Sequence, residues 1–345
     1  MSKKRKQPGT AYTNKTFHYL YKKYSFMRKL IHSVILLFIA LTAASAQTSD
    51  RQYATAAETG GNVVVLLETA SWGQNYPFNE QCWTRYNGTT HAKTGCVATA
   101  YAIVMRYHKY PKEGTAKPLY NCQASDYVEI TDRVYDWDNM PLVYDGNWTE
   151  EQIYEVSKIM SHLAHANFSS FGAGGTTANE ERETARLNRY FNYPKVAASY
   201  QREHTQEQWE AMIRESLDNG CPVPYAANNS GTGDSRHMFV IDGYTDNGYF
   251  HFNFGWNGSG NGWFRLNAIK PYQGDDYSWK QNSEHYANFN LAPEGATGID
   301  EVKGESTIDA SQSGNVKAIY DLQGRKVETP SKGIYIIDGK KVIIK

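Results

Sequence analysis

The sequence lacks a charge imbalance, has few cysteines and contains only one long apolar run. Lys and Arg together number 36, as do Asp and Glu, so the formal net charge at pH 7 is zero. Without a basic excess, nucleic acid and anionic membranes are not expected as main partners. The Cys and His spacing of zinc modules is also absent, so we predict neither a metal nor an organic cofactor. The 345 residues suffice for one large domain and a small one.

The single long apolar run lies near the N-terminus. The basic stretch Lys22–Lys29 precedes the run Val34–Leu41, and the small residues Ala44–Ala46 follow it. This order is typical of a secretory signal peptide, and the run is too short to span a bilayer as a helix. We predict cleavage near Ala46 and a mature protein that is secreted or at the cell surface, without a stable membrane span. A retained membrane anchor is the alternative, and Met1 and Met27 are both candidate start residues.

A helix that is apolar on nearly all faces follows Gly95. The small and apolar residues of the stretch Gly95–Pro111 predict a buried helix that Pro111 ends. Cys96 then lies in its first turn, where backbone N–H groups and the helix dipole stabilise a thiolate. Cysteines in such positions have pKa values of roughly 3.5–7.5 and act as nucleophiles. A small buried cysteine in a core helix is the structural alternative.

The pairing of the four cysteines depends on the role of Cys96. They are Cys82, Cys96, Cys122 and Cys221. In an exported protein an even count favours two disulfides. If Cys96 is a nucleophile, one of the other three also stays unpaired, and we favour a Cys82–Cys122 bridge. The nucleophilic thiol of an exported enzyme is open to oxidation, so it implies a reducing environment.

Helices are predicted first along the chain and an antiparallel sheet second. Val63–Leu67 predicts a buried strand, and capping boxes at Thr149 and Thr205 open two helices. The other predicted elements are a helix over Ala178–Phe191, strands near Val223–Ala227, Met238–Tyr244, Tyr249–Phe254 and Gly262–Leu266, and a hairpin turn at Asp246–Gly248. This order favours an α+β fold with a helical lobe and a β lobe.

Two polar side chains and one loop are candidates for a site with Cys96. His237 begins an apolar strand about 140 residues after Cys96, which is the Cys-before-His order of cysteine peptidases. A packed core histidine is the alternative. Gln74, in an aromatic turn, either offers an amide N–H to an oxyanion or stabilises the turn. The glycine-rich segment Phe168–Thr177 is either a flexible loop or a place where backbone approaches a ligand.

Four motifs follow one another along the chain: His91–Ala100, Met105–Pro111, His237–Gly243 and His251–Gly258. They resemble the streptopain family of papain-like cysteine peptidases, and the resemblance covers roughly Val63–Pro293. It implies a two-lobed papain-like fold whose helical lobe carries the nucleophile Cys96 and whose β lobe carries the general base His237. It also implies a secreted cysteine endopeptidase that hydrolyses proteins and peptides by a thiolate–imidazolium mechanism through an acyl-enzyme.

The resemblance assigns the remaining site residues as well. Gln74 and the backbone N–H of Cys96 would be the oxyanion donors, and Asn253 would orient His237. The residues implied for substrate binding are Gly174, Gly175, Arg236 and Trp256, of which Trp256 would wall the cleft and the two glycines belong to a loop that forms substrate subsites.

Three departures from the family pattern bear on specificity and latency. Arg236 stands where the family tends to have Gly, and Phe254 where it has Trp, so substrate preference is expected to differ. Family members usually carry a long inhibitory propeptide, whereas 47–62 is short. Latency is then kept by this segment, by a separate protein inhibitor, or not at all. The predicted organisation is a leader over 1–46, a lead or pro-segment over 47–62, a peptidase domain over 63–293 and a C-terminal part over 294–345.

The C-terminal part predicts a linker followed by a small β module. Thr297–Glu301 indicates the linker, and Val316–Val327 and Lys332–Lys345 contain apolar strand-like runs with a hairpin signal at Asp338-Gly339. The module resembles the C-terminal sorting domains of type IX secretion in Gram-negative bacteria, which implies delivery to the surface or the medium. A plain β appendage is the alternative.

Two other functions fit the same motifs. A surface binding protein on a papain-like scaffold would have lost catalysis through Arg236 and Phe254, but the intact Cys96, His237 and Gln74 argue against it. An amidase or acyl transferase would use the same thiolate on another acyl donor, and only substrate trials separate it from a peptidase.

Overall fold

The computed structural model describes residues 53–83, 90–123, 127–172, 175–179, 182–231, 236–280 and 284–294, and three C-terminal strands. The predicted leader and signal peptide lie outside these residues. No helix in the described ranges combines the length and the apolar character needed to cross a membrane.

Helices dominate the first half of the described chain and strands the second, as the sequence predicts. The helices are α2 (Cys96–His108), α3 (Glu150–Ala166), α4 (Glu183–Phe191) and α5 (Gln206–Asp218). The strands are β1 (Val63–Leu66), β2 (Leu119–Tyr120), β3 (Glu129–Ile130), β4 (Ser199–Tyr200), β5 (Val223–Asn228), β6 (Arg236–Thr245), β7 (Phe250–Asn253), β8 (Gly262–Phe264), β9 (His285–Ala287), β10 (Ile319–Tyr320), β11 (Gly333–Ile337) and β12 (Lys340–Ile344). Short 3-10 helices lie at Ala57–Thr59, Trp137–Asn139, Gln201–Glu203 and Leu266–Ala268.

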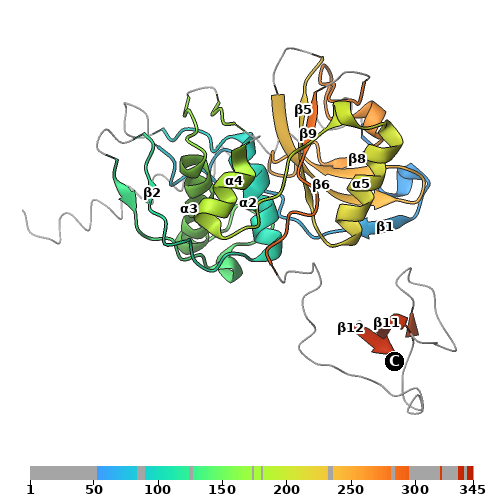
Figure 1. Ribbon diagram of the computed structural model, residues 1–345, viewed down its shortest axis with the longest axis horizontal. Coiled ribbons are helices and arrows are strands. Elements are labelled where there is room, and N and C mark those ends of the chain that lie inside the picture. Colours follow the sequence, from blue (N-terminus) through green and yellow to red (C-terminus); the bar gives the residue numbers. More distant parts are fainter. Residues whose placement is uncertain are drawn as a thin grey trace, which may run out of the picture. The chain divides into compact units, whose positions relative to one another are not determined.

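Strand β6 is the element that the two halves share. It lies within an antiparallel sheet of order β4-β9-β5-β6-β7-β8, and β1 also pairs with it. Successive side chains of a strand point to opposite faces. Met238 and Val240 accordingly pack into the core of the helical half, whereas Phe239 and Ile241 pack into the core of the β half, which α5 covers. Figure 1 shows α5 alongside β6 in the β half.

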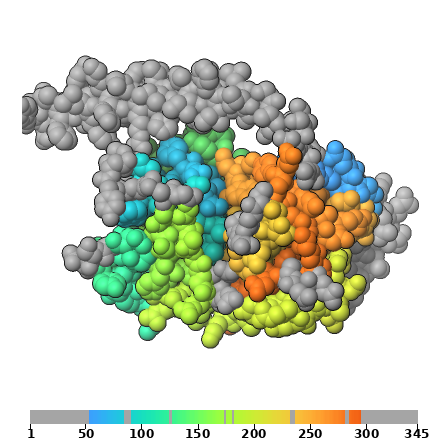
Figure 2. Space-filling view, turned by 90° about the horizontal axis from the view of Figure 1, so that it is seen from above, coloured from blue at the N-terminus to red at the C-terminus, as the bar shows by residue number. Residues whose placement is uncertain are grey.

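Helix α2 is the central element of the helical half. Every residue from Val97 to Met105 is buried, and α3 and the β6 side chains pack around it. The helix ends at His108, where Lys109 adopts a left-handed conformation, slightly before the predicted stop at Pro111. Figure 2 shows the two halves side by side, the helical half in blue-green to lime and the β half in yellow to orange. Because all faces of α2 are buried, its first residue is held firmly.

The predicted helix starts are confirmed for α3 and α5. Thr149 and Thr205 each accept a hydrogen bond from the backbone N–H three residues on, and the Gln152 and Gln208 side chains return the bond, which completes two capping boxes. Helix α4 begins at Glu183, later than the predicted start at Ala178.

The predicted burial of the first strand is wrong. Strand β1 forms, but Val63, Val64 and Leu66 are 43%, 47% and 54% exposed. It pairs with β6 near Gly243–Thr245 and lies off the main strand order of the sheet. A run of β-branched residues predicts a strand but does not distinguish a covered strand from an open one.

The C-terminal strands form a sheet of their own, in the order β10-β11-β12. Strands β11 and β12 pair antiparallel from Gly333 with Ile344 to Ile337 with Lys340. This pairing agrees with the hairpin predicted there, although Asp338 and Gly339 lie outside the described residues. The function of this sheet remains a prediction.

Replacing Thr205 by Ala should lower the free energy of unfolding by about 1 kcal/mol, because the first-turn N–H groups of α5 lose an acceptor. Urea unfolding followed by circular dichroism measures the change. The matched control is Thr205→Ser, which keeps the hydroxyl and should stay close to the parent. Equal stability of the Ala and Ser variants would contradict the capping role.

Candidate active site

Cys96 is the first residue of α2, as predicted. Gly95 before it has φ +90°, a conformation that side chains disfavour, and an added Cβ would come 3.0 Å from the Thr176 carbonyl oxygen. The Thr99 hydroxyl donates to the Gly95 carbonyl at 2.9 Å and lies 2.7 Å from the Thr94 hydroxyl. These bonds fix the turn that presents Cys96 at the positive end of the helix dipole.

The turn after β7 is docked on this helix start. Gly255 has φ +67°, and a Cβ there would lie 3.0 Å from Thr99 Cγ2, so the backbone at Gly255 packs closely on the Thr99 side chain. Two residues on, the Asn257 N–H donates to the Trp72 carbonyl at 3.0 Å. The segment that follows β7 therefore contacts both α2 and the turn that contains Gln74.

Gln74 is tied to the chain just before Cys96. The Thr94 N–H donates to the Gln74 carbonyl at 3.1 Å. The Gln74 side chain is half-buried and lines a cavity of 590 Å³ that Trp256 also lines. The other lining residues are Gly73, Asn75, Tyr76, Phe78, Lys93, Asn257, Ser259 and Tyr272, among which Lys93 is the only charged side chain. Gln74 and Trp256, which were both predicted for the site, thus line the same cavity.

His237 lies at the start of β6 with its ring fixed from one side. Its Nε2 is 2.8 Å from the Phe254 carbonyl oxygen. Since a carbonyl only accepts, Nε2 must carry the proton, and Nδ1 of the neutral ring is left as the atom that can accept one. The amino-acid sequence does not reveal this contact, because any residue type supplies the same backbone carbonyl.

Aromatic rings cover His237. The Trp256 ring stacks on it with centroids 4.8 Å apart and planes 21° apart, and the Phe254 ring lies nearly parallel at 6.4 Å. The Trp256 and Phe254 rings thus shield His237 on this side. Burial lowers the pKa of His237 from 6.5 to about 4, although the bond to Phe254 acts in the opposite direction.

Tyr277 links the surroundings of Cys96 and His237. Its ring centroid is 6.0 Å from that of His237. Burial and the charges of Asp275 and Cys96 raise the pKa of Tyr277, so Cys96 lies within electrostatic reach of the phenol. The segment around Tyr277 has no regular structure, and no sequence motif marks it.

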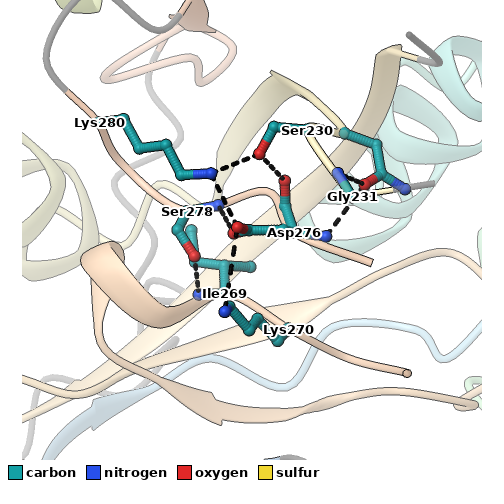
Figure 3. A network of polar contacts seen from close by, with 8 residues as sticks. Ser230, Gly231, Ile269, Lys270, Asp276, Ser278 and Lys280 are labelled. Atoms are coloured by element: carbon teal, nitrogen blue, oxygen red, sulfur yellow. Dashed lines mark hydrogen bonds and ion pairs between the residues drawn. The ribbon is translucent and has the colours of Figure 1, made fainter. Parts of the chain in front are cut away.

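A polar network joins the segment around Tyr277 to residues 229–231, which follow β5. Ser230 and Asp276 join the two segments, with the Ser230 N–H donating to the Asp276 carbonyl at 2.8 Å (Figure 3). Lys280 Nζ donates to the Asp276 carboxylate at 2.8 Å and to the Ser230 hydroxyl at 2.6 Å. Burial opposes ionisation of Asp276, but the bonds from Lys280 and Ser278 prevail and lower its pKa to about 2. The carboxylate is therefore charged throughout the neutral range.

Asn253 is not placed as predicted. Its Nδ2 donates to the Thr69 hydroxyl at 3.0 Å and to the Ala70 carbonyl at 2.9 Å, and its Oδ1 accepts from the Gly255 N–H at 3.3 Å. The contact with His237 is made by the carbonyl of the next residue instead. Asn253 shapes the turn that positions Phe254, so it acts on His237 through the backbone.

The residues predicted for substrate binding separate into three cases. Arg236 turns away from His237, as neighbours in a strand must, and donates to Asn228 Oδ1 at 3.1 Å and to the Glu284 carbonyl at 3.0 Å. Gly175 is exposed, and a Cβ there would meet nothing within 4 Å. Gly174 lies outside the described residues.

The predicted Cys82–Cys122 disulfide is wrong. No disulfide joins the cysteines: Cys82 is a buried free thiol, and Cys122 Sγ lies 3.3 Å from His165 Nδ1. Each thiol has its own environment in the helical half, which a count of cysteines cannot reveal. Within the described ranges, no three His, Cys, Asp or Glu side chains are grouped as metal ligands.

Comparison with known proteins decides the family. The sequence profile of the peptidase C10 family matches residues 72–264, more than half of the chain. The chain belongs to the peptidase C10 family. Streptopain from Streptococcus pyogenes is 32% identical over 191 residues, which are 52% of this chain and 47% of streptopain. The thiol protease/hemagglutinin PrtT from Porphyromonas gingivalis is 32% identical over 225 residues, 61% of this chain and 25% of that protein. This C10 chain thus matches about half the length of streptopain, and less of PrtT.

Solved structures agree with the fold. The active wild-type interpain A cysteine protease of Prevotella intermedia is 29% identical with a TM-score of 0.59, covering 67% of this C10 chain and 95% of that chain. A prointerpain A fragment from the same organism is 27% identical with a TM-score of 0.56, covering 78% and 83%. The papain-like two-lobed α+β fold predicted from the sequence is confirmed.

His237 should remain uncharged well below neutral pH when the thiol is removed. In the Cys96→Ala variant, NMR titration of the ring nitrogens should show a midpoint near pH 4, because burial disfavours the imidazolium. The urea-unfolded variant is the control and should titrate near pH 6.5. Since the unfolded chain takes up the proton first, acidification from pH 6.5 to 4 should also destabilise the fold through this group. A folded-state midpoint at 6.5 or above would contradict the buried, neutral ring.

Proposed function

We propose that this C10 chain is an endopeptidase that hydrolyses peptide bonds in proteins with Cys96 as nucleophile and His237 as general base. The observation that carries the proposal is the convergence of three separate segments. The start of α2, the Gln74 turn and the turn after β7 are joined by the contacts of Thr94, Gly255 and Asn257, and the last of these turns carries the ring that covers His237.

The proposed reaction begins with transfer of the Cys96 proton to His237 Nδ1. The thiolate attacks the carbonyl carbon of the scissile bond, and the oxyanion accepts hydrogen bonds from the Gln74 amide and the Cys96 N–H. The imidazolium returns its proton to the departing amine, which leaves a thioester. Water, deprotonated by His237, then attacks the thioester, so that a carboxylic acid leaves and the thiol is restored.

The tautomer of His237 supports this order of events. The bond from Nε2 to the Phe254 carbonyl remains in place whether the ring is neutral or protonated, so only Nδ1 changes its proton during a turnover. The aromatic rings of Phe254 and Trp256 limit the access of water to the ring. Both features keep the base in one orientation.

We also propose export through the signal-type segment that ends near Ala46, with activity at the cell surface or in the medium. A sorting role for the C-terminal sheet and control by a separate protein inhibitor belong to the same proposal. The short lead is partly described. The Ala54 N–H donates to the Trp263 carbonyl at 3.3 Å and Asn62 Nδ2 to Asp246 at 2.8 Å, so 53–62 contributes contacts to the β half.

Hydrolysis of a fluorogenic protein substrate under reducing conditions should fall by on the order of 10⁴-fold or more in Cys96→Ala and in His237→Ala, because no other group replaces either. Cys122→Ser is the matched control, since Cys122 is another half-buried thiol beside a histidine, and it should retain full activity. E-64 should modify the parent at Cys96 alone, as peptide mapping would show. Labelling at Cys122, or an active Cys96→Ala variant, would overturn the assignment.

Gln74→Ala should reduce kcat by about 10²–10³-fold with little change in KM, because the lost amide stabilises the oxyanion and not the bound substrate. Steady-state kinetics on one peptide substrate separates the two constants. Asn75→Ala, which alters the neighbouring side chain of the same cavity, is the control. An increase in KM at constant kcat would instead give Gln74 a role in substrate binding.

A further inference from the structure

A second and larger cavity lies in the helical half between α4 and the segment 115–117. Its volume is 1060 Å³, and neither Cys96 nor His237 lines it. The lining residues are Thr115, Ala116, Lys117, Phe168, Ala185, Arg186, Asn188, Arg189, Tyr190, Asn192 and Lys195. No role described so far uses this cavity.

All the charged side chains that line this cavity are positive. Lys117, Arg186, Arg189 and Lys195 all contribute, and no carboxylate lines the cavity. Across the described part of the chain, none of these four cations forms an ion pair. Two guanidinium groups are fixed by aromatic rings, Arg186 over Phe168 at 4.7 Å and Arg189 over Tyr190 at 5.4 Å. Arg186 also donates to the Ala166 carbonyl at 3.4 Å. Positive groups without a carboxylate partner in the lining, two of them held in place, are available to an anion.

The walls of the cavity are held together by a buried cation. Arg133 is 8% exposed, and its guanidinium donates to the Lys117 carbonyl at 2.6 Å, to the Thr115 carbonyl at 3.2 Å and to the Tyr190 carbonyl. The Thr115 hydroxyl donates to the Arg189 carbonyl at 2.8 Å. The carbonyls of Arg189 and Tyr190 in the last turn of α4 thus accept hydrogen bonds, and the buried Arg133 cation offsets the negative end of this helix dipole.

A chain of contacts connects the cavity with the start of α2. Phe168 at the rim begins the segment in which Ser170 pairs with Thr177 through two backbone hydrogen bonds of 2.9 and 3.1 Å. The neighbouring Thr176 donates its hydroxyl to the Lys93 carbonyl at 2.5 Å, and its own carbonyl lies against Gly95. The cavity and Cys96 are thus placed on the two ends of one short connected segment.

We infer that this cavity is an exosite that binds an acidic segment of a protein substrate, apart from the bond that is cleaved. The inference rests on the proposed function, since a peptidase meets polypeptide in every catalytic encounter. Guanidinium groups bind carboxylates with two parallel hydrogen bonds, and Asn192 in the lining can offer an amide donor to a peptide backbone. Binding at a second point raises the effective concentration of the same substrate at Cys96.

The test measures binding without catalysis. The full chain carrying Cys96→Ala is titrated into fluorescein-labelled hexaglutamate peptide at 0.15 M salt, and fluorescence anisotropy is recorded. The double reversal Lys117→Glu/Arg189→Glu, at two exposed positions, should weaken binding at least about tenfold. The matched control is Arg202→Glu/Arg265→Glu, which reverses two exposed arginines that also lie over tyrosine rings, and it should bind like the parent.

The outcomes separate this inference from the proposed function. The anisotropy experiment uses the inactive Cys96→Ala chain. It therefore measures binding of hexaglutamate even if the chain proves not to be a peptidase. Equal binding by both double variants, or no binding of hexaglutamate, overturns the exosite. Binding of a heparin oligosaccharide that depends on Lys117 and Arg189, without binding of hexaglutamate, overturns the peptide ligand in favour of a sulfated glycan.

In the active chain, an acidic tail on a reporter substrate should lower KM and leave kcat unchanged, and the Lys117→Glu/Arg189→Glu variant should lose this advantage.

Discussion

The close approach of the turn after β7 to the first turn of α2 is the contact on which the rest of the site depends. Gly255 lies against Thr99 with no room for a side chain, and the Asn257 N–H reaches the Trp72 carbonyl. These contacts bring together three segments that are far apart in the sequence. A larger residue at 255 would need a strained positive φ and would press on the Thr99 side chain in the first turn of the helix that Cys96 begins.

Backbone groups position the two candidate catalytic side chains. The His237 tautomer is set by a carbonyl oxygen and the Cys96 position by the turn at Gly95. Such groups carry no charge that solvent or salt can screen strongly. They hold their geometry at little entropic cost, because the backbone around them is already fixed by the sheet and the helix.

Local sequence patterns predicted what depends on local physics. The α2 helix follows from its apolar faces and the preceding glycine, and two capping boxes marked helix starts within a residue. The patterns failed where contacts with residues far along the chain determine the position or burial of a side chain. The side chains of strand β1 are exposed, the side chain of Asn253 bonds to Thr69 and Ala70, and Cys82 and Cys122 contact different neighbours. The contact of Tyr277 with His237 could not be predicted, because Tyr277 lies in an irregular segment that tertiary contacts hold in place.

The burial of α2 on all faces has a consequence for how the molecule loses function. The helix that carries the candidate nucleophile is also the centre of the helical core, so its first turn cannot loosen while the core behind it stays intact. Heating or denaturant that melts the helical core should therefore also abolish thiol reactivity, because the turn that presents Cys96 is lost with it. Loss of activity would then serve as a faithful record of unfolding, and selection for a working site would at the same time be selection for a stable helical half.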